Sequence, residues 1–272
     1  MKELFKKYGL KPSKKMGQNF LTNKSIAQKI VKSAEIGNED FVLEVGPGLG
    51  ILTKELAGTA LKVLAVEKDK KLIALLKEEL NNFKNIEIIN ADILKLLRTN
   101  AAQNLCPKNY KVAANLPFNI ASAVIRGFLE AERQPETMSL IVQKEVAQRI
   151  VAKPGDMNML ALSVQFYAEA KITSYILRGA FYPPPKVDAA IIKLTPRNRL
   201  NLFQPELFFK IARAGFSHPR KQLAGNLSKG LKIERDKVES WLKNNGVEPS
   251  RRAETLSLSA WLSLAESTPP PI

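Results

Sequence analysis

Residues 41–50 of this 272-residue chain read Phe41-Val-Leu-Glu-Val-Gly-Pro-Gly-Leu-Gly50, and this stretch decides the fold. A mostly apolar run that ends in closely spaced glycines is typical of a buried strand followed by a tight turn. The next residues, 51–57, have the apolar spacing of a helix. Because glycines lack a Cβ atom and let the backbone approach a ligand closely, this strand–turn–helix unit predicts a binding loop.

Helical and strand-like segments alternate on both sides of this turn. A helix capped by Ser25 is expected at 25–34, before the first strand. Such alternation is typical of βαβ units, whose strands form a mostly parallel sheet. Downstream, the hydrophobic pattern predicts strands at 61–66, 86–89, 110–114 and 138–142, and helices at 69–80 and 120–131.

The pattern changes after residue 170. Two strand-like runs, 172–177 and 187–194, lie on either side of three consecutive prolines, and they predict an antiparallel pair that closes the sheet. Beyond Pro196 the periodicity is helical, which predicts a small all-α domain at the end of the chain. Its helices are expected at 206–215, 220–231, 234–244 and 257–266.

The charge of the chain is uneven. We expect three segments: a basic N-terminal arm at 1–24, an α/β domain at 25–197 and a helical domain at 198–272. The chain has 42 basic and 26 acidic residues, a net charge of +16. The arm alone carries +6 and residues 186–252 carry +9, so a nearly neutral body has two basic flanks. These flanks indicate that the binding partner is a long polyanion such as a nucleic acid. The alternative is that the charged segments are only solvated surface, which is also common.

Composition argues against a membrane, disulfide or metal protein. The longest uncharged stretch, 112–125, has 14 residues, and a spanning helix needs roughly 18 apolar ones. The single cysteine, Cys106, cannot form an internal disulfide. His218 is the only histidine, and no set of Cys, His and carboxylate residues accompanies it. We therefore expect a cytoplasmic protein with no membrane contact and no metal.

Acidic residues follow the next two strands. Glu67 ends the second strand, 21 residues after Gly46, where its carboxylate can accept hydrogen bonds from ribose hydroxyls. Asp92 follows the third strand and can accept from an adenine amino group. The glycines of the turn, Gly48 among them, have the spacing Gly-x-Gly-x-Gly, which favours S-adenosylmethionine over NAD as the ligand. The turn is not followed by the Lys-Ser/Thr pair of a P-loop, so ATP hydrolysis is not expected. These strand ends predict an S-adenosylmethionine site.

The fourth strand ends in Asn115-Leu-Pro-Phe118. The Asn115 carboxamide and the Leu116 carbonyl can accept both hydrogens of an adenine N6 amine, which would localise the nitrogen lone pair for attack. Pro117 stiffens the turn and has no N–H that would compete, and Phe118 can stack on the base. In the alternative interpretation Asn115 caps the next helix and Phe118 belongs to the core.

With these motifs the chain resembles the ribosomal RNA adenine N6,N6-dimethyltransferases, most closely the small-subunit type. The resemblance runs from about Lys14 to Leu264. The motifs that carry it are Gly17-Gln-Asn-Phe-Leu21, Glu44-Val-Gly-Pro-Gly48, Glu67, Asp92, Asn115-Leu-Pro-Phe118, Gln143-Lys-Glu-Val146, Phe181 with Pro183-Pro-Pro-Lys-Val-Asp188, and Phe216 with Arg220-Lys221.

The resemblance implies a Rossmann-like, class I S-adenosylmethionine-dependent methyltransferase fold with a small helical C-terminal domain. Phe181 would form the second aromatic wall of the base pocket, opposite Phe118. We expect the basic flanks to hold the RNA backbone, through Lys14, Lys15, Arg220 and Lys221. The implied cofactor contacts, with Gly48 added from the glycine turn, are Asn19, Leu21, Gly46, Gly48, Glu67, Asp92 and Asn115.

The chain departs from the family pattern at three places. Phe118 stands where a tyrosine is usual, which keeps the stacking face and loses a hydroxyl. Pro219 replaces an arginine, so one phosphate contact is missing or moved. Asn158-Met159 replaces a Tyr-Gly pair in a segment expected to pack under the base pocket.

The expected activity is N6,N6-dimethylation of two adjacent adenosines in the 3′-terminal hairpin loop of 16S rRNA, by a monomer that acts on the small subunit or its precursor. Three alternatives remain open. They are a 23S rRNA dimethyltransferase of the macrolide-resistance type, a DNA adenine methyltransferase, and a ribosome-assembly factor with little catalysis.

Overall fold

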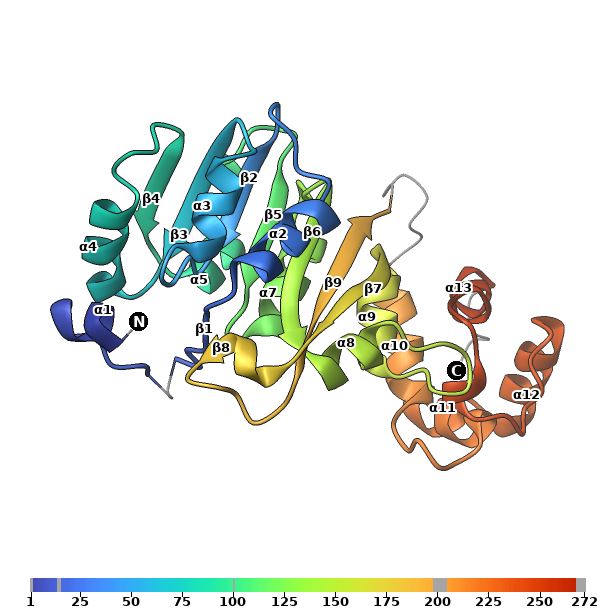
Figure 1. Cartoon of the computed structure of the whole chain (residues 1–272). Helices are drawn as coiled ribbons and strands as arrows, with labels where there is room; N and C mark the ends of the chain where they lie inside the picture. Colours follow the sequence, from blue (N-terminus) through green and yellow to red (C-terminus); the bar gives the residue numbers. More distant parts are fainter. Residues whose placement is uncertain (1, 14–15, 100, 198–204, 268–272) are drawn as a thin grey trace. The chain divides into compact units, whose positions relative to one another are not determined.

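The computed structural model describes residues 2–13, 16–99, 101–197 and 205–267 (Figure 1). The chain forms two compact units. The first contains Met1–Ala147 and Glu169–Pro196, and the second contains Gln148–Ala168 and Arg197–Ile272.

A seven-stranded sheet forms the centre of the first unit (Figure 1). Its strand order is β4-β3-β2-β5-β6-β9-β7. The first five strands in this order are parallel to one another, and β9 is antiparallel to β6. The predicted α/β class, with a mostly parallel sheet closed by two late strands, is therefore confirmed. The strands are β2 Phe41–Val45, β3 Lys62–Glu67, β4 Ile86–Asn90, β5 Lys111–Asn115, β6 Thr137–Gln143, β7 Ala168–Ile176 and β9 Ala189–Pro196.

Five helices of this unit, α3 to α7, connect the parallel strands, and two more, α1 and α2, precede the sheet. The helix expected at 25–34 is α2, and its N-cap is Asn23 rather than Ser25. The reason is that the Asn23 side chain accepts from the Ser25 N–H at 2.9 Å, which satisfies a donor at the start of the helix. The helices are α1 Lys2–Lys7, α2 Lys24–Ser33, α3 Ile51–Ala57, α4 Lys70–Glu79, α5 Ile93–Arg98, α6 Ala101–Asn104 and α7 Ala121–Glu130, and the chain passes from the first unit to the second within α8, Lys144–Ile150.

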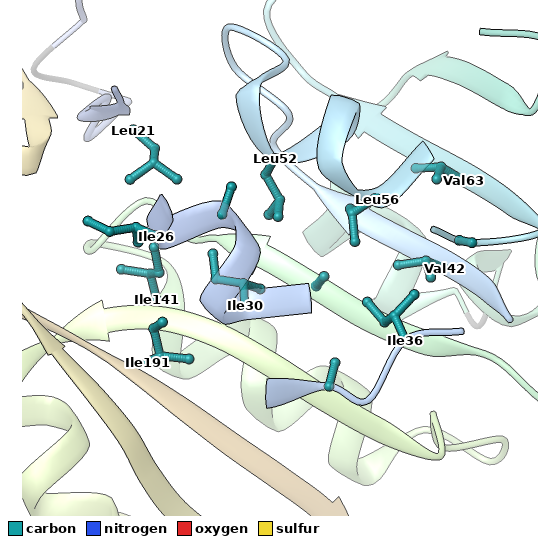
Figure 2. Close-up of a cluster of buried hydrophobic side chains, with 14 of the residues drawn as sticks. Leu21, Ile26, Ile30, Ile36, Val42, Leu52, Leu56, Val63, Ile141 and Ile191 are labelled. Atoms are coloured by element: carbon teal, nitrogen blue, oxygen red, sulfur yellow. The ribbon is translucent and has the colours of Figure 1, made fainter. Parts of the chain in front are cut away.

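The core beside β2 is packed by α2 and α3. Figure 2 shows Ile30 of α2 and Leu56 of α3 above the strands that carry Val42 and Ile141. All four side chains are fully buried. Each such burial stabilises the fold by roughly 1.5–3 kcal/mol, so this packing fixes the position of the glycine turn between β2 and α3.

The N-terminal segment is part of the first unit rather than a separate arm. Phe5 and Leu10 are buried in a cluster with Phe20 and with Leu72 and Leu75 of α4. A separate arm at 1–24 is expected from the net positive charge that its lysines give it. The apolar residues between those lysines provide the packing.

A small pair of strands joins this segment to the loop before β9. β1, Phe20–Leu21, is antiparallel to β8, Phe181–Tyr182, and Leu21 faces Phe181. A short 3-10 helix, Arg178–Ala180, precedes β8. The pairing brings the first motif of the sequence next to the Phe181 motif.

The second unit is helical, as predicted for the end of the chain. It also includes residues 148–168, which the sequence pattern places in the α/β domain. The physical reason is aromatic packing, because Phe166 lies 4.3 Å from Phe208 between ring centres. Trp241 and Trp261 are buried in this unit. The elements are α9 Met159–Gln165, α10 Pro205–Gly215, α11 Leu223–Leu231, α12 Arg235–Asn244, the 3-10 helix Ala253–Thr255 and α13 Leu258–Glu266.

Candidate cofactor and base site

A cavity of about 590 Å³ lies at the carboxyl ends of β2, β3 and β5. This size is within the range of pockets that enclose a small molecule or cofactor. All seven residues expected to contact a cofactor line it, as do Leu116 and Pro117 of the expected base site. The seven are Asn19, Leu21, Gly46, Gly48, Glu67, Asp92 and Asn115.

The glycine turn forms one wall of the cavity. Gly46, Gly48 and Gly50 have φ angles of +68°, +59° and +80°, the left-handed region that favours glycine. A Cβ atom on Gly48 would lie 3.0 Å from a ring carbon of Phe20. The turn therefore requires glycine for its conformation and, at Gly48, also for the close approach of the N-terminal segment.

Glu67 is fixed at the end of β3 by the turn beside it. Its Oε2 accepts from the Gly48 N–H at 3.3 Å, and its Oε1 accepts from the Asp69 N–H at 2.8 Å. Burial raises the pKa of Glu67, and these two N–H groups oppose the shift. The carboxylate is thus held in one position on the cavity wall.

Asp92 occupies the end of the next strand. Its Oδ1 accepts from the Leu94 N–H at 3.0 Å and caps α5, while its Oδ2 lies 2.9 Å from Lys68 Nζ. The Lys68 ammonium lowers the pKa of Asp92, so the group is a carboxylate at neutral pH. Both oxygens already have partners, and a bound adenine would share the carboxylate with Lys68.

Glu44 also lines the cavity, and no role was predicted for it. Glu44 lies on β2 and is only 1% exposed to solvent. Its Oε2 atom has no hydrogen-bond partner among the described residues. Burial raises its pKa to about 8, with smaller effects from the Thr53 hydroxyl, which lowers it, and from the Glu67 carboxylate, which raises it. One signal could have identified it: an acid inside the apolar run that leads into the glycine turn.

Replacing Glu44 with glutamine is expected to remove part of the pH dependence of stability. The carboxyl has an ordinary pKa of 4.5 and a folded pKa of about 8. Between these pH values the folded chain binds one more proton than the unfolded chain. Stability therefore falls as the pH rises through the window, by up to about 1.4 kcal/mol per pH unit.

Urea unfolding between pH 5 and pH 8 measures this slope. The Glu44→Gln variant should lose less stability than wild type over the range. Glu87→Gln, an exposed position on β4, is the matched control and should keep the wild-type slope. Equal slopes for all three proteins would contradict the assignment.

The turn after β5 presents Asn115 to the cavity. Its Nδ2 donates to the Asn19 carbonyl at 2.9 Å, which leaves the carboxamide oxygen as the group available to accept. The Leu116 N–H donates to the Ile141 carbonyl at 3.3 Å. Asn115 does not cap α7, whose N-cap is Ile120 with no side-chain cap bond, so the capping part of the alternative interpretation is wrong. Its other part, Phe118 in the core, agrees with the packing of Phe118 against the core cluster.

The two phenylalanines expected to enclose a base are not among the residues that line this cavity. Phe181 is 3% exposed in the core cluster beside β2, and Phe118 packs against the same cluster while half-buried. Phe181 faces Leu21 across the β1–β8 pair, and Leu21 does line the cavity. The aromatic walls of the base site therefore remain a prediction.

The residues expected to hold RNA are placed only in part. Lys14 and Lys15 lie outside the described residues. Arg220 and Lys221 are exposed in the second unit, in the turn before α11, which begins at Leu223 instead of the expected residue 220. Phe216 of the same motif stacks on Trp261 at 5.5 Å between ring centres.

Asn158, one of the departures from the family pattern, acts as the N-cap of α9. Its Oδ1 accepts from the N–H groups of Leu160 and Ala161, both at 3.1 Å. The segment is therefore a helix start in the second unit, and its expected place under the base pocket stays a prediction.

The described residues lack two other features, a cluster of metal ligands and a membrane-spanning helix. In that part of the chain no group of three or more His, Cys, Asp and Glu side chains could hold a metal ion. None of its helices has the length and apolar character to cross a membrane.

Comparisons with known sequences point to one family. The sequence model of "Ribosomal RNA adenine dimethylase" matches residues 9–268. A "Ribosomal RNA small subunit methyltransferase A" of Dehalococcoides mccartyi strain BAV1 is 46% identical over 265 residues, which cover 97% of this chain and 90% of that protein. The protein of the same name from Alkaliphilus oremlandii is 39% identical, and the match covers 98% of this chain and 95% of that protein.

Solved structures agree in fold. The 23S rRNA methyltransferase ErmE is 29% identical with a TM-score of 0.73, and the match covers 92% of this chain and 99% of that chain. A dimethyladenosine transferase from Plasmodium falciparum is 27% identical with a TM-score of 0.75, covering 90% and 95%. The fold is that of class I S-adenosylmethionine-dependent methyltransferases. With the matched family model and relatives above 30% identity, the chain belongs to the ribosomal RNA adenine dimethylase family.

Proposed function

We propose that this protein uses S-adenosylmethionine to dimethylate the N6 amines of two adjacent adenosines in the 3′-terminal hairpin loop of 16S rRNA. It would act in the cytoplasm as a monomer, on the small subunit or its precursor. The observation that carries the proposal is the cavity in which Asn115, at the end of β5, lies beside the glycine turn and Glu67. The small-subunit assignment is supported by the names of its 46% and 39% identical relatives.

The residues of the cavity fit S-adenosylmethionine. Glu67 would accept hydrogen bonds from the ribose hydroxyls, and Asp92 would accept one from the adenine amino group. The buried Glu44 Oε2, which has no partner among the described residues, offers an acceptor for a cationic group at the β2 end of the cavity. The bound cofactor supplies an electrophilic methyl group on a sulfonium.

Asn115 and Leu116 would orient the target amine. The free carboxamide oxygen of Asn115 and the carbonyl of Leu116 would accept the two N6 hydrogens, which turns the nitrogen lone pair toward the methyl group. A base in a stacked loop must leave its stack to reach this position. Catalysis then rests on positioning and on exclusion of water, and the proton can leave to solvent after transfer.

RNA would be held outside this cavity. Arg220 and Lys221 are exposed and lie in one of the two basic flanks, and Lys14 and Lys15 belong to the other. Together with Phe118 and Phe181 as the walls of the base pocket, these contacts complete the proposed site. Lysine and arginine contacts to phosphates contribute affinity that falls with salt.

A second candidate is a 23S rRNA dimethyltransferase, because ErmE matches 92% of this chain at a TM-score of 0.73. The proposal is tested by incubating the protein with S-adenosylmethionine and either small or large subunits from unmodified cells. Mass spectrometry of rRNA fragments should find dimethyladenosine at two adjacent positions of 16S rRNA. Modified 23S rRNA would favour the second candidate, and binding of small subunits without methyl transfer would favour an assembly factor.

A further inference from the structure

A second hollow, of about 630 Å³, lies at the carboxyl edge of the sheet beyond β6. Lys144, Leu177, Arg178 and Lys186 are among the residues that line it. Beside it lies Tyr175, near the end of β7, with Lys144 Nζ 5.5 Å from the centre of its ring. We call these five residues the Tyr175 patch, and all of them belong to the first unit.

The apolar members of the Tyr175 patch are open to solvent. Tyr175 is 56% exposed and Leu177 is 76% exposed. Among the described residues only two other large hydrophobic side chains are classed as exposed, Leu61 and Leu105. β7 is the last strand of the sheet, and its residues alternate between exposed and less exposed from Glu169 to Tyr175. Exposed apolar side chains that lie together mark a contact surface more often than isolated ones do.

The cations of the Tyr175 patch have no ion pair among the described residues. The nearby Asp188 is used otherwise: its Oδ1 accepts from the Arg178 N–H at 3.0 Å, and its carbonyl accepts from the Lys144 N–H at 3.0 Å. These bonds fix the backbone that carries both cations. Glu145 is the other acid that lines the hollow, so three cations face two acids, one of which is already engaged.

The patch lies close to the base site within the same sheet. Asn115 at the end of β5 is paired with Ile141 of β6, and Lys144 follows three residues later. Three residues of extended chain span roughly 10 Å. Lys144 is therefore one strand away from the position proposed for the target amine, and Tyr175 lies two strands further along the sheet, on β7.

We infer that the Tyr175 patch binds the nucleotides that flank the extruded adenosine, with a base stacked on Tyr175 and phosphates near Lys144, Arg178 and Lys186. The inference rests on the proposed function. An exposed aromatic ring among unpaired cations is the combination that binds single-stranded RNA. Charged residues are depleted at the centre of protein–protein contacts, so a protein partner fits this patch less well.

Tyr175→Ala tests the stacking. The probe is a fluorescein-labelled RNA stem–loop with two adjacent adenosines in its loop, and the measurement is fluorescence anisotropy. The loss of one stacked base weakens binding by roughly 1–3 kcal/mol, which corresponds to an increase of about 5- to 150-fold in Kd. Tyr175→Phe keeps the ring and should bind within about twofold of wild type.

Lys144→Gln tests the phosphate contact. For single-stranded RNA, each lost phosphate contact should lower the slope of log Kd against log salt by about 0.7. The matched control is Lys108→Gln, an exposed lysine three residues before β5 begins, at the other edge of the sheet. It should keep the wild-type slope.

The outcomes separate this inference from the proposed function. If wild type binds and methylates the stem–loop and Tyr175→Ala binds it equally well, the inference is wrong and the function stands. If wild type transfers methyl groups to no ribosomal RNA, the proposed function fails and the inference fails with it. A Tyr175→Phe variant as weak as Tyr175→Ala, with an unchanged melting temperature, would also overturn the stacking.

Discussion

Replacing Asn115 with alanine is expected to lower kcat for methyl transfer by at least about 100-fold, the largest effect of any substitution proposed for this protein. The side chain loses the carboxamide oxygen that would accept from the target amine. It also loses the Nδ2 donor that holds the Asn19 carbonyl at 2.9 Å. A small displacement of a reacting group alone can cost about 100-fold, so both losses act in the same direction.

Methyl transfer to small subunits from unmodified cells, with labelled S-adenosylmethionine, measures this effect. Cofactor affinity should be determined in parallel and should change far less than kcat. Asn82→Ala, an exposed position between α4 and β4, is the matched control and should retain the wild-type rate. A wild-type rate for Asn115→Ala would show that the base site is elsewhere.

Glu67→Ala is expected to raise the Kd for S-adenosylmethionine by about 100-fold. Hydrogen bonds to a charged acceptor are worth about 1.5–3 kcal/mol, and Glu67 would accept two from the ribose. The substitution also frees the Gly48 and Asp69 N–H groups, which the carboxylate now holds at 3.3 and 2.8 Å. The substitution would therefore disturb the glycine turn and remove the ribose contacts at the same time.

Isothermal titration with S-adenosylmethionine measures this change directly. Glu87→Ala on the neighbouring strand β4 removes an exposed acid and should leave the Kd within about twofold of wild type. Glu67→Gln keeps the shape of the side chain and removes the charge. A Kd for Glu67→Ala close to that of wild type would exclude Glu67 from the cofactor site.

The sheet could be predicted from the sequence because its signals are local. The signals are an apolar run that ends at a glycine turn and an acid or an asparagine at or just after the end of each of the next three strands. Each signal depends on burial and turn geometry over only a few residues. The cavity confirms that Gly46, Glu67 and Asn115 lie together, as the carboxyl edge of a parallel sheet requires.

Other features depend on contacts distant in the sequence, and no local pattern revealed them. The segment 148–168 joins the second unit through Phe166, whose partner Phe208 lies 42 residues later. Phe181 looks like a site residue in its motif, yet it is buried in the core through its strand pair with Leu21. The cap of α2 differs by only two residues from the expected one, because Asn and Ser are both good caps and only geometry separates them.

The discontinuous second unit also affects how this chain is synthesised. Residues 148–168 leave the translating ribosome before the helices that complete their unit exist. At roughly 5–20 residues per second, Phe208 leaves the ribosome about 2–8 s after Phe166 does. During that interval the nascent chain exposes Phe166 without its aromatic partner, and a chaperone that protects residues 148–168 would act before termination.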